Sequence, residues 1–280
     1  MLRLTSLCLA SHLVHGAVAW GNLGHETVGY VAQEFLAPKA LAFVQSSLGS
    51  TYDQSLGVAA TWADTVKYET AYEWSAGLHF VDAEGKCDVV PKPKNAHSQL
   101  FYVYIRQPAN VLFRFRNSRL WGRTMHITNL HAAWDTGILT KNVDANHGSS
   151  ATTYASYLIG EIQSGSYASL TSSWLSCTST TEPLSSKRAS EPTIASDINS
   201  LLTARSEDAT IKPLECPLVW AKEANAYDCS TVFPFTENSD ACTGTYYTKA
   251  IPVIDLQLAK QGYRLAAWLN VIFDGSTNLS

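Results

Sequence analysis

Apolar side chains recur at helical spacing along most of this chain, and this periodicity constrains its fold more than any other feature of the sequence. The pattern predicts helices over residues 25–36, 152–163 and 194–205, and two more that begin near Pro217 and Pro252. Proline suits the first turn of a helix because the N–H groups of that turn have no partner within the helix. No run of alternating apolar and polar residues is long enough to predict a sheet. The sequence therefore predicts a mainly α fold in a single domain.

The limits of several elements follow from helix breakers and from composition. Pro38 is expected to stop the first helix, and Gly165 to follow the end of the second. Residues 169–192 are rich in Ser, Thr and Pro and predict a long surface loop. The last helix is expected to bury one apolar face, because helices of soluble domains turn such a stripe toward the core. That face holds Ile254, Leu258, Leu265, Trp268, Leu269 and Ile272.

The first 19 residues have the composition of a secretory signal peptide. Arg3 supplies a positive charge, residues 4–14 are mostly apolar, and Ala17-Val-Ala19 fits the small-residue rule for cleavage. Cleavage there leaves Trp20 as the first residue of a secreted protein, in which 20–280 form the mature domain. The alternative is a buried N-terminal helix. No other apolar run is long enough to span a membrane, and we expect a monomer without a membrane partner.

Charge and cysteine content limit how such a protein can work. The net charge of −4 provides no strong basic field, so a nucleic-acid partner would be held by metal and local contacts. Removing the signal peptide removes Cys8 and leaves five cysteines, namely Cys87, Cys177, Cys216, Cys229 and Cys242. Secretion favours disulfides, and an odd number leaves one thiol unpaired.

Three pairs of residues carry the donor atoms that zinc prefers, nitrogen and carboxylate oxygen. They are Trp20 with His25, Asp64 with His79, and His131 with Asp135. A helix places the last two on one face, one turn apart, although a surface hydrogen bond is the alternative. A processed terminus would offer the α-amine, whose pKa of about 8 favours loss of its proton to a metal. Without that role Trp20 would be an apolar plug and His25 a helix-start residue.

Five motifs occur in an order that resembles the S1/P1 family of fungal single-strand nucleases. They are Trp20-Gly-x-x-Gly-His25, Trp62-Ala-Asp64, Leu78-His79-Phe80, Asn129-Leu-His131-Ala-x-Trp134-Asp135 and Gly262-Tyr-Arg-Leu-Ala-Ala-Trp268-Leu. The resemblance implies a helical domain with three zinc ions in a cleft, related in architecture to zinc phospholipase C. It also implies hydrolysis of phosphodiester bonds in single-stranded DNA and RNA, and removal of 3′-phosphates from nucleotides.

The same resemblance implies roles for individual residues. Each of the three pairs would bind one zinc ion. Lys67 would lie beside the phosphate with Asp64 and meet charge that develops in the transition state, unless it is simply an exposed lysine. Phe80 would stack on an unpaired base, unless it is ordinary core, and Asp82 would contact the base edge. Cys87 and Cys229 would form a disulfide.

One segment departs from the family pattern. Residues 89–134 contain no Asp or Glu, but they carry seven of the 20 basic residues of the chain. The family places a helix with an H-x-x-x-D motif, followed by another His, where this chain has the atypical segment 89–127. Its only histidines are His97 and His126, and neither has an Asp four residues later. Each zinc ion is left with two matched ligands, below the usual three, so fewer than three ions are possible here.

Two explanations fit this departure, and they lead to different functions. In the first explanation, a retained intron or a shifted reading frame has altered this segment of the sequence, and the intact gene encodes an ordinary zinc nuclease. In the second, the protein has truly diverged and is a secreted, non-catalytic α-helical protein. Zinc content separates the two functions. A zinc phospholipase of similar architecture is a third possibility, and both Phe80 and the motif from Asn129 to Asp135 favour the nuclease over it.

Overall fold

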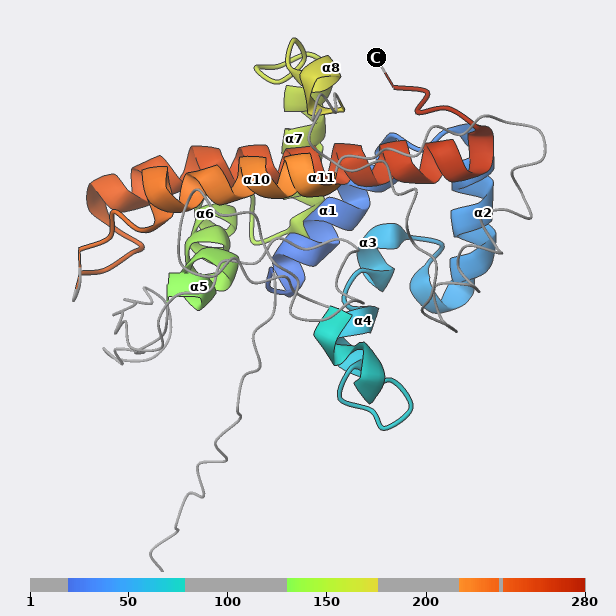
Figure 1. Cartoon of the computed structure of the whole chain (residues 1–280), viewed down its shortest axis with the longest axis horizontal. Helices are drawn as coiled ribbons and strands as arrows, with labels where there is room; N and C mark the ends of the chain where they lie inside the picture. The colour runs from blue at the N-terminus through green and yellow to red at the C-terminus, as the bar shows by residue number, and fades with distance from the viewer. Residues whose placement is uncertain (1–19, 79–129, 176–216, 237–238, 280) are drawn as a thin grey trace, which may run out of the picture.

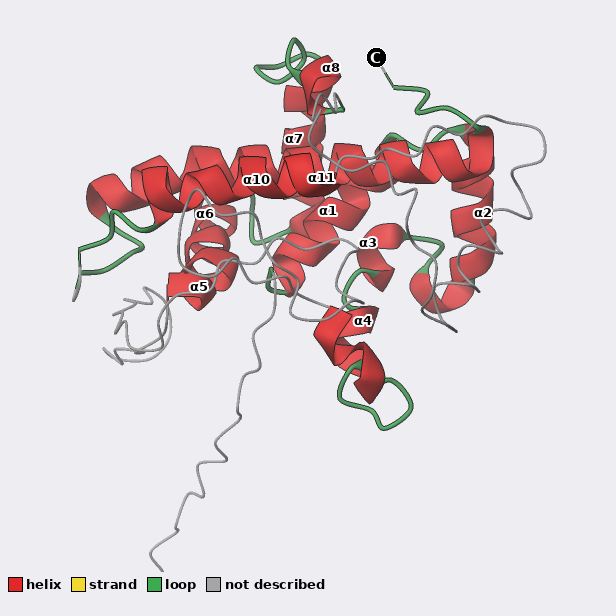
Figure 2. Cartoon of the chain, viewed as in Figure 1, coloured by secondary structure: helices red, strands yellow, loops and turns green. Residues whose placement is uncertain are grey.

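The computed structural model of the chain describes residues 20–78, 130–175, 217–236 and 239–279 (Figure 1). Every regular element in these ranges is a helix, and none is a strand (Figure 2). The prediction of a mainly α domain is therefore confirmed. The helix predicted over 194–205 and the atypical segment 89–127 lie outside the described residues, as do four predicted site residues. These four are His79, Phe80, Asp82 and Cys87.

The long C-terminal helix α11 (Gly244–Asp274) runs along the molecule, and several of the other helices pack on it (Figure 1). Ile254 and Leu258 on this helix are completely buried. Against it lies α1 (Asn22–Glu34), and the two backbones approach closely at Gly262. A Cβ atom at Gly262 would lie 2.5 Å from Cγ1 of Val31, so only glycine permits this approach. None of the described helices is both long and apolar enough to cross a membrane.

A buried asparagine holds the connection between α1 and α2 (Pro38–Leu48). Oδ1 of Asn270 accepts a hydrogen bond from the backbone N–H of Ala37 at 2.6 Å, and its Nδ2 donates to the carbonyl of Phe35 at 3.0 Å. Pro38 occupies the first turn of α2. It therefore starts a second helix, and α1 ends three residues earlier at the capping residue Phe35.

The segment that carries Asp64 is anchored to α1. It contains η1 (Ser50–Tyr52), α3 (Leu56–Ala59), α4 (Trp62–Val66) and η2 (Glu73–Leu78). The N–H of Leu56 donates to Oε1 of Gln33 at 2.6 Å. At Gly29 an added Cβ would lie 2.6 Å from the carbonyl oxygen of Leu56, so α3 packs directly on the α1 backbone. These contacts fix where α4 begins.

The segment that carries His131 and Asp135 is one continuous helical stretch with a π-helical centre. It comprises α5 (Leu130–Ala132), the π-helix η3 (Ala133–Ile138) and α6 (Leu139–Asn146). Leu130, Ile138 and Leu139 are buried in the core. After a short turn, α7 (Ala151–Gln163) follows within one residue of its predicted start, and it is capped by the Ser150 side chain.

The remaining described elements are α8 (Thr171–Trp174), α10 (Pro217–Tyr227) and the π-helix η4 (Asp228–Val232). The prediction that Pro217 begins a helix is confirmed. Lys260 and Arg264 of α11 both form ion pairs with Glu223 of α10. Both basic side chains are buried and Glu223 is partly exposed, so these partly buried pairs join α10 to α11.

Three sequence predictions about this region are wrong. Pro252 does not begin α11, because this helix starts eight residues earlier at Gly244. A proline inside a helix leaves the carbonyl four residues before it without a helical partner, here that of Thr248. Pro252 and Thr248 are both exposed, so the helix can continue through the proline. Leu265, Trp268, Leu269 and Ile272 are only partly buried, because the small residues Ala266 and Ala267 face the core instead. Within the predicted loop 169–192, residues 171–174 form a helix instead, while residues 176–192 lie outside the described residues. The Trp174 ring is buried and packs edge to face on Tyr263 of α11.

Candidate metal and catalytic site

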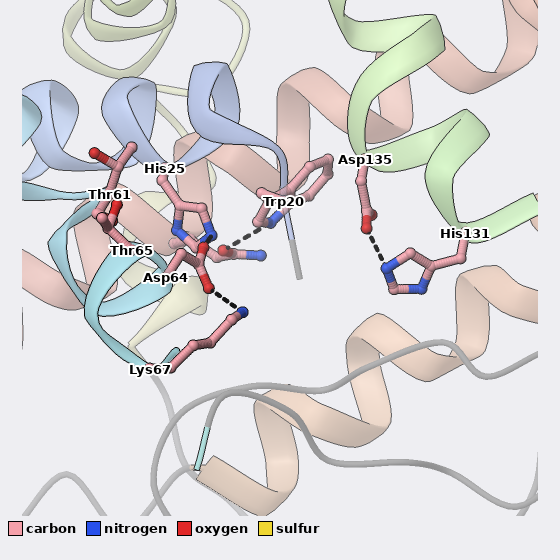
Figure 3. Close-up of polar contacts among 9 residues, drawn as sticks. Trp20, His25, Thr61, Asp64, Thr65, Lys67, His131 and Asp135 are labelled. Atoms are coloured by element: carbon pink, nitrogen blue, oxygen red, sulfur yellow. Dashed lines mark hydrogen bonds and ion pairs between the residues drawn. The ribbon is translucent and has the colours of Figure 1, made fainter. Parts of the chain in front are cut away.

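His25 and Asp64 meet although they come from different elements. Nε2 of His25 on α1 lies 2.9 Å from Oδ2 of Asp64 on α4 (Figure 3). Each side chain is only 12% exposed. The sequence assigned them to different zinc pairs, so this contact joins two of the predicted sites.

Lys67 completes an ion-pair chain at this position. Its Nζ lies 2.7 Å from Oδ1 of Asp64, and the lysine is 6% exposed (Figure 3). The alternative of an exposed lysine is therefore wrong. Burial alone raises the pKa of Asp64, but hydrogen bonds from His25 and Lys67 outweigh it and lower the pKa to about 2. Asp64 is consequently a carboxylate at any physiological pH.

His131 and Asp135 pair with each other as their spacing predicts. Nε2 of His131 contacts Oδ2 of Asp135, one turn further along the helical stretch (Figure 3). Burial raises the pKa of Asp135 to about 6, against the lowering effect of the hydrogen bond from His131. The charges of His25 and Asp64 also act on Asp135, the first lowering and the second raising its pKa. The two ion-paired groups therefore lie within electrostatic reach of each other.

A π-helix carries Asp135, and a hydrogen-bond chain that begins at the neighbouring Trp134 holds this π-helix in place. The Trp134 indole N–H donates to the Tyr246 hydroxyl at 2.7 Å, and that hydroxyl donates to the Val232 carbonyl at 2.8 Å. Trp134 is 5% exposed, so the chain runs through the core. It links the π-helix η3 to α11 and to the π-helix η4. Single-turn π-helices are frequent at functional sites because they displace side chains from the regular helical register.

Trp20 docks beside this group of residues. Its indole N–H donates to Oε1 of Gln261 on α11 at 3.1 Å, and the N–H of Gly21 donates to the Asp135 carbonyl at 3.1 Å. A Cβ atom at Gly21 would lie 2.6 Å from Oγ1 of Thr136, so only glycine fits between Trp20 and the π-helix. The first residue of the predicted mature chain is thereby held between α11 and η3.

The donor atoms of these residues fit zinc, but each group is partial. Nε2 of His25 and the Oδ2 atoms of Asp64 and Asp135 are all buried, and their chemistry is that of zinc ligands. Among the described residues, however, no three His, Cys, Asp or Glu side chains group closely enough to hold a metal ion. The predicted partner His79 lies outside those residues. Sequence reasoning missed Gln261, Tyr246 and Thr136, which lack local patterns that mark a site.

The two described cysteines differ. Cys229 is disulfide-bonded, and its partner lies outside the described residues. Cys242 is a free, buried thiol, and burial raises its pKa to about 12. Cys242 is therefore not the partner of Cys229, and the predicted bond to Cys87 stays a prediction.

Comparison with known proteins shows to which family this chain belongs. The family described as S1/P1 Nuclease matches residues 20–119 and 111–274, which together span most of the chain. This chain belongs to the S1/P1 nuclease family. The match begins at residue 20, the predicted mature terminus, and its two parts meet at residues 111–119, inside the atypical segment 89–127.

Alignments to individual relatives cover almost the whole of this chain. Nuclease S1 of Aspergillus oryzae is 32% identical over 312 aligned positions, which cover 97% of each chain. Nuclease P1 of Penicillium citrinum is 29% identical and covers 90% of this chain and 97% of its own length. Endonuclease 5 of Arabidopsis thaliana is 22% identical over 100% of this chain and 99% of its own. Because 312 positions exceed the 280 residues here, the alignment to nuclease S1 has gaps opposite residues that this chain lacks. Family membership implies that the protein is a nuclease.

The hydroxyl of Tyr246 gives a direct test of what holds the π-helix. Tyr246→Phe is expected to lower the free energy of unfolding by about 1–3 kcal/mol, because the Trp134 N–H and the Val232 carbonyl both lose their partner. Urea denaturation of the variant and the unchanged protein measures this loss. Tyr247→Phe, at the adjacent half-buried position, is the matched control. Equal losses in both variants would show that the hydrogen-bond chain contributes nothing specific.

Proposed function

We propose that this protein is a secreted, zinc-dependent phosphodiesterase that hydrolyses single-stranded DNA and RNA and removes 3′-phosphates from nucleotides. Membership of the S1/P1 nuclease family supports the reaction class. The observation that carries the proposal is the meeting of His25, Asp64 and Lys67 from two separate helices, within electrostatic reach of Asp135. Burying so many charged groups is costly unless they pair or bind a ligand, so their grouping favours a functional site.

The predicted zinc ligands are the Trp20 terminus with His25, Asp64 with His79, and His131 with Asp135. When bound, zinc would activate water for attack on phosphorus and offset the negative charge of the phosphate. Asp64, with a pKa of about 2, stays ionised and suits a cation. The contact between His25 and Asp64 places a nitrogen donor beside an oxygen donor, although the two residues are assigned to different zinc ions. The contact between His131 and Asp135 does the same for two residues assigned to one ion.

Lys67 is assigned to the phosphate. Its ammonium group is buried and held by Asp64 at 2.7 Å, so its position does not depend on a flexible surface side chain. A preorganised cation in a site that excludes water stabilises developing negative charge more strongly than one in bulk water. Asp64 therefore serves both as a ligand and as the group that orients Lys67.

Zinc-dependent cleavage tests this proposal against the non-catalytic alternative. That alternative is favoured by the lack of an H-x-x-x-D motif in the sequence of residues 89–127. The purified mature chain should cleave a single-stranded oligonucleotide faster than the same sequence as a duplex. Chelation should stop cleavage, and added zinc should restore it. Bound zinc is measured on the same samples. A chain with no zinc-dependent cleavage at high protein concentration would instead be a non-catalytic member of the family.

The mature protein is expected to begin at Trp20. Residues 1–19 have signal-peptide composition, and the structure docks Trp20 and Gly21 against α11 and the π-helix. N-terminal sequencing of secreted material should read Trp-Gly-Asn. Secreted, zinc-loaded protein that starts at Met1 would contradict the role of the terminal amine.

Cys87 and Cys229 are expected to form a disulfide, as the family resemblance implies. Cys229 is disulfide-bonded in the structure. Closing a loop of this length corresponds to a stabilisation of roughly 5 kcal/mol in the chain-entropy description. Peptide mapping without reduction should recover the two peptides linked. Recovery of Cys229 linked to Cys177 or Cys216 would show that the pairing is wrong.

A further inference from the structure

We propose that exposed aromatic side chains between the start of α4 and the start of η2 form a second binding subsite, which stacks unpaired bases of the strand beyond the reacting nucleotide. These residues, called here the aromatic platform, are Trp62, Tyr68, Tyr72 and Trp74. The proposal rests on the proposed nuclease function and extends it. It is separate from the stacking position implied for Phe80.

The exposed rings are concentrated in one short stretch of the chain, residues 62–74. They are 44%, 67%, 36% and 65% exposed, in the order of the sequence. Half of the eight exposed large hydrophobic side chains in the described parts of the chain fall within residues 62–74. All four are tyrosine or tryptophan. Clustered apolar exposure marks an interaction surface, whereas single exposed side chains are ordinary.

Contacts connect the platform to the candidate site. Trp62 begins α4 two residues before Asp64, and Tyr68 directly follows Lys67. The Lys67 Nζ lies 5.4 Å from the centre of the Tyr68 ring, while the same atom binds Asp64. Figure 3 shows Asp64 and Lys67 projecting from α4 beside His25. A strand whose phosphate reaches Lys67 would therefore bring its next bases to Tyr68.

Two further contacts hold the platform rings in place. Trp62 and Tyr72 pack edge to face with ring centres 5.4 Å apart. The indole N–H of Trp74 donates to the Ala71 carbonyl at 3.1 Å. Rings with fixed orientation lose little entropy when a base stacks on them, and this favours their use as a binding surface.

The charges around the rings favour bases over the phosphate backbone. Glu69 and Glu73 are exposed within the same stretch and would repel phosphate. Every base offers a π-face for stacking, but only an unpaired base can present it fully. The platform should therefore add affinity for single strands that depends on the bases and only weakly on salt, since counterion release follows phosphate contacts.

Strands with and without bases provide the test. The probes are a fluorescent twelve-nucleotide oligothymidylate with phosphorothioate linkages, which resist cleavage, and an abasic strand of the same length and linkage. Zinc-supplemented protein should bind the thymidylate more tightly than the abasic strand. Tyr68→Ala and Trp74→Ala should each reduce this preference by about fivefold or more, and Tyr68→Phe should retain it because the ring remains. Fluorescence anisotropy at two salt concentrations measures the affinities.

Tyr157→Ala is the matched control, because Tyr157 is 41% exposed but lies on α7. It should leave the preference for bases unchanged. If both alanine variants retain that preference, or if wild type binds the two strands equally, the platform is wrong while the nuclease function stands. If wild type neither binds nor cleaves any strand, both proposals are wrong.

Discussion

The protein with this exact sequence is expected to bind zinc weakly and to cleave single-stranded DNA slowly. The matched residues supply two ligands for each of the three family sites, where catalytic zinc usually has three. The bridging Asp implied by the family helix is missing, so two close zinc ions would repel each other with little compensation.

Loss of zinc should also lower stability. Metal binding supplies folding free energy, and burial raises the pKa of Asp135 to about 6, so this buried carboxyl would be ionised at neutral pH. Among the described residues, His131 and His25 lower this pKa, but burial outweighs them. We therefore expect a low melting temperature that rises when zinc is added. The test is to express residues 20–280, measure bound zinc and melting temperature, and assay cleavage.

A second protein makes this test specific. A chain in which the atypical segment 89–127 is replaced by a family segment with the H-x-x-x-D helix and the following His should gain zinc and activity together. Full zinc loading and rapid cleavage by the unchanged chain would contradict the prediction. In that case His97, His126 or other residues of the segment would complete the centre.

Removing either member of the helical pair is expected to abolish most of the activity that remains. His131→Ala and Asp135→Ala each delete one predicted ligand of the same zinc ion. Changes to groups that merely support a ligand cost about 10–100-fold in metal affinity or activity, so loss of a ligand itself should cost about 100-fold or more. Zinc content should fall together with the rate of single-strand cleavage.

Asp144→Ala provides the control for this pair. Asp144 is an exposed carboxylate on α6, the next element of the same helical stretch, and its removal should change neither zinc content nor rate. A purely structural His131–Asp135 ion pair makes a different prediction. Its loss would lower the free energy of unfolding, but both variants would keep their zinc and near-normal rates.

Local patterns in the sequence were enough to predict several elements. The 3.6-residue period located α1 and α7, and Pro217 located the start of α10. The same reasoning failed at Pro252, because a proline tolerated on an exposed helix face leaves no local sign that the helix continues through it. It also failed at residues 171–174, where Trp174 is buried against Tyr263 of α11, far away in the sequence.

The sequence by itself determined the pairs that lie within one helical turn. His131 with Asp135, and Asp64 with Lys67, meet because spacings of four and three residues place side chains on one helix face. Only the tertiary structure decided that His25 reaches Asp64, that Gln261 holds Trp20, and that Lys67 is buried. Those contacts depend on how α1 packs on α3 and α11, through close approaches at Gly29 and Gly262, and no spacing along the chain encodes such distances.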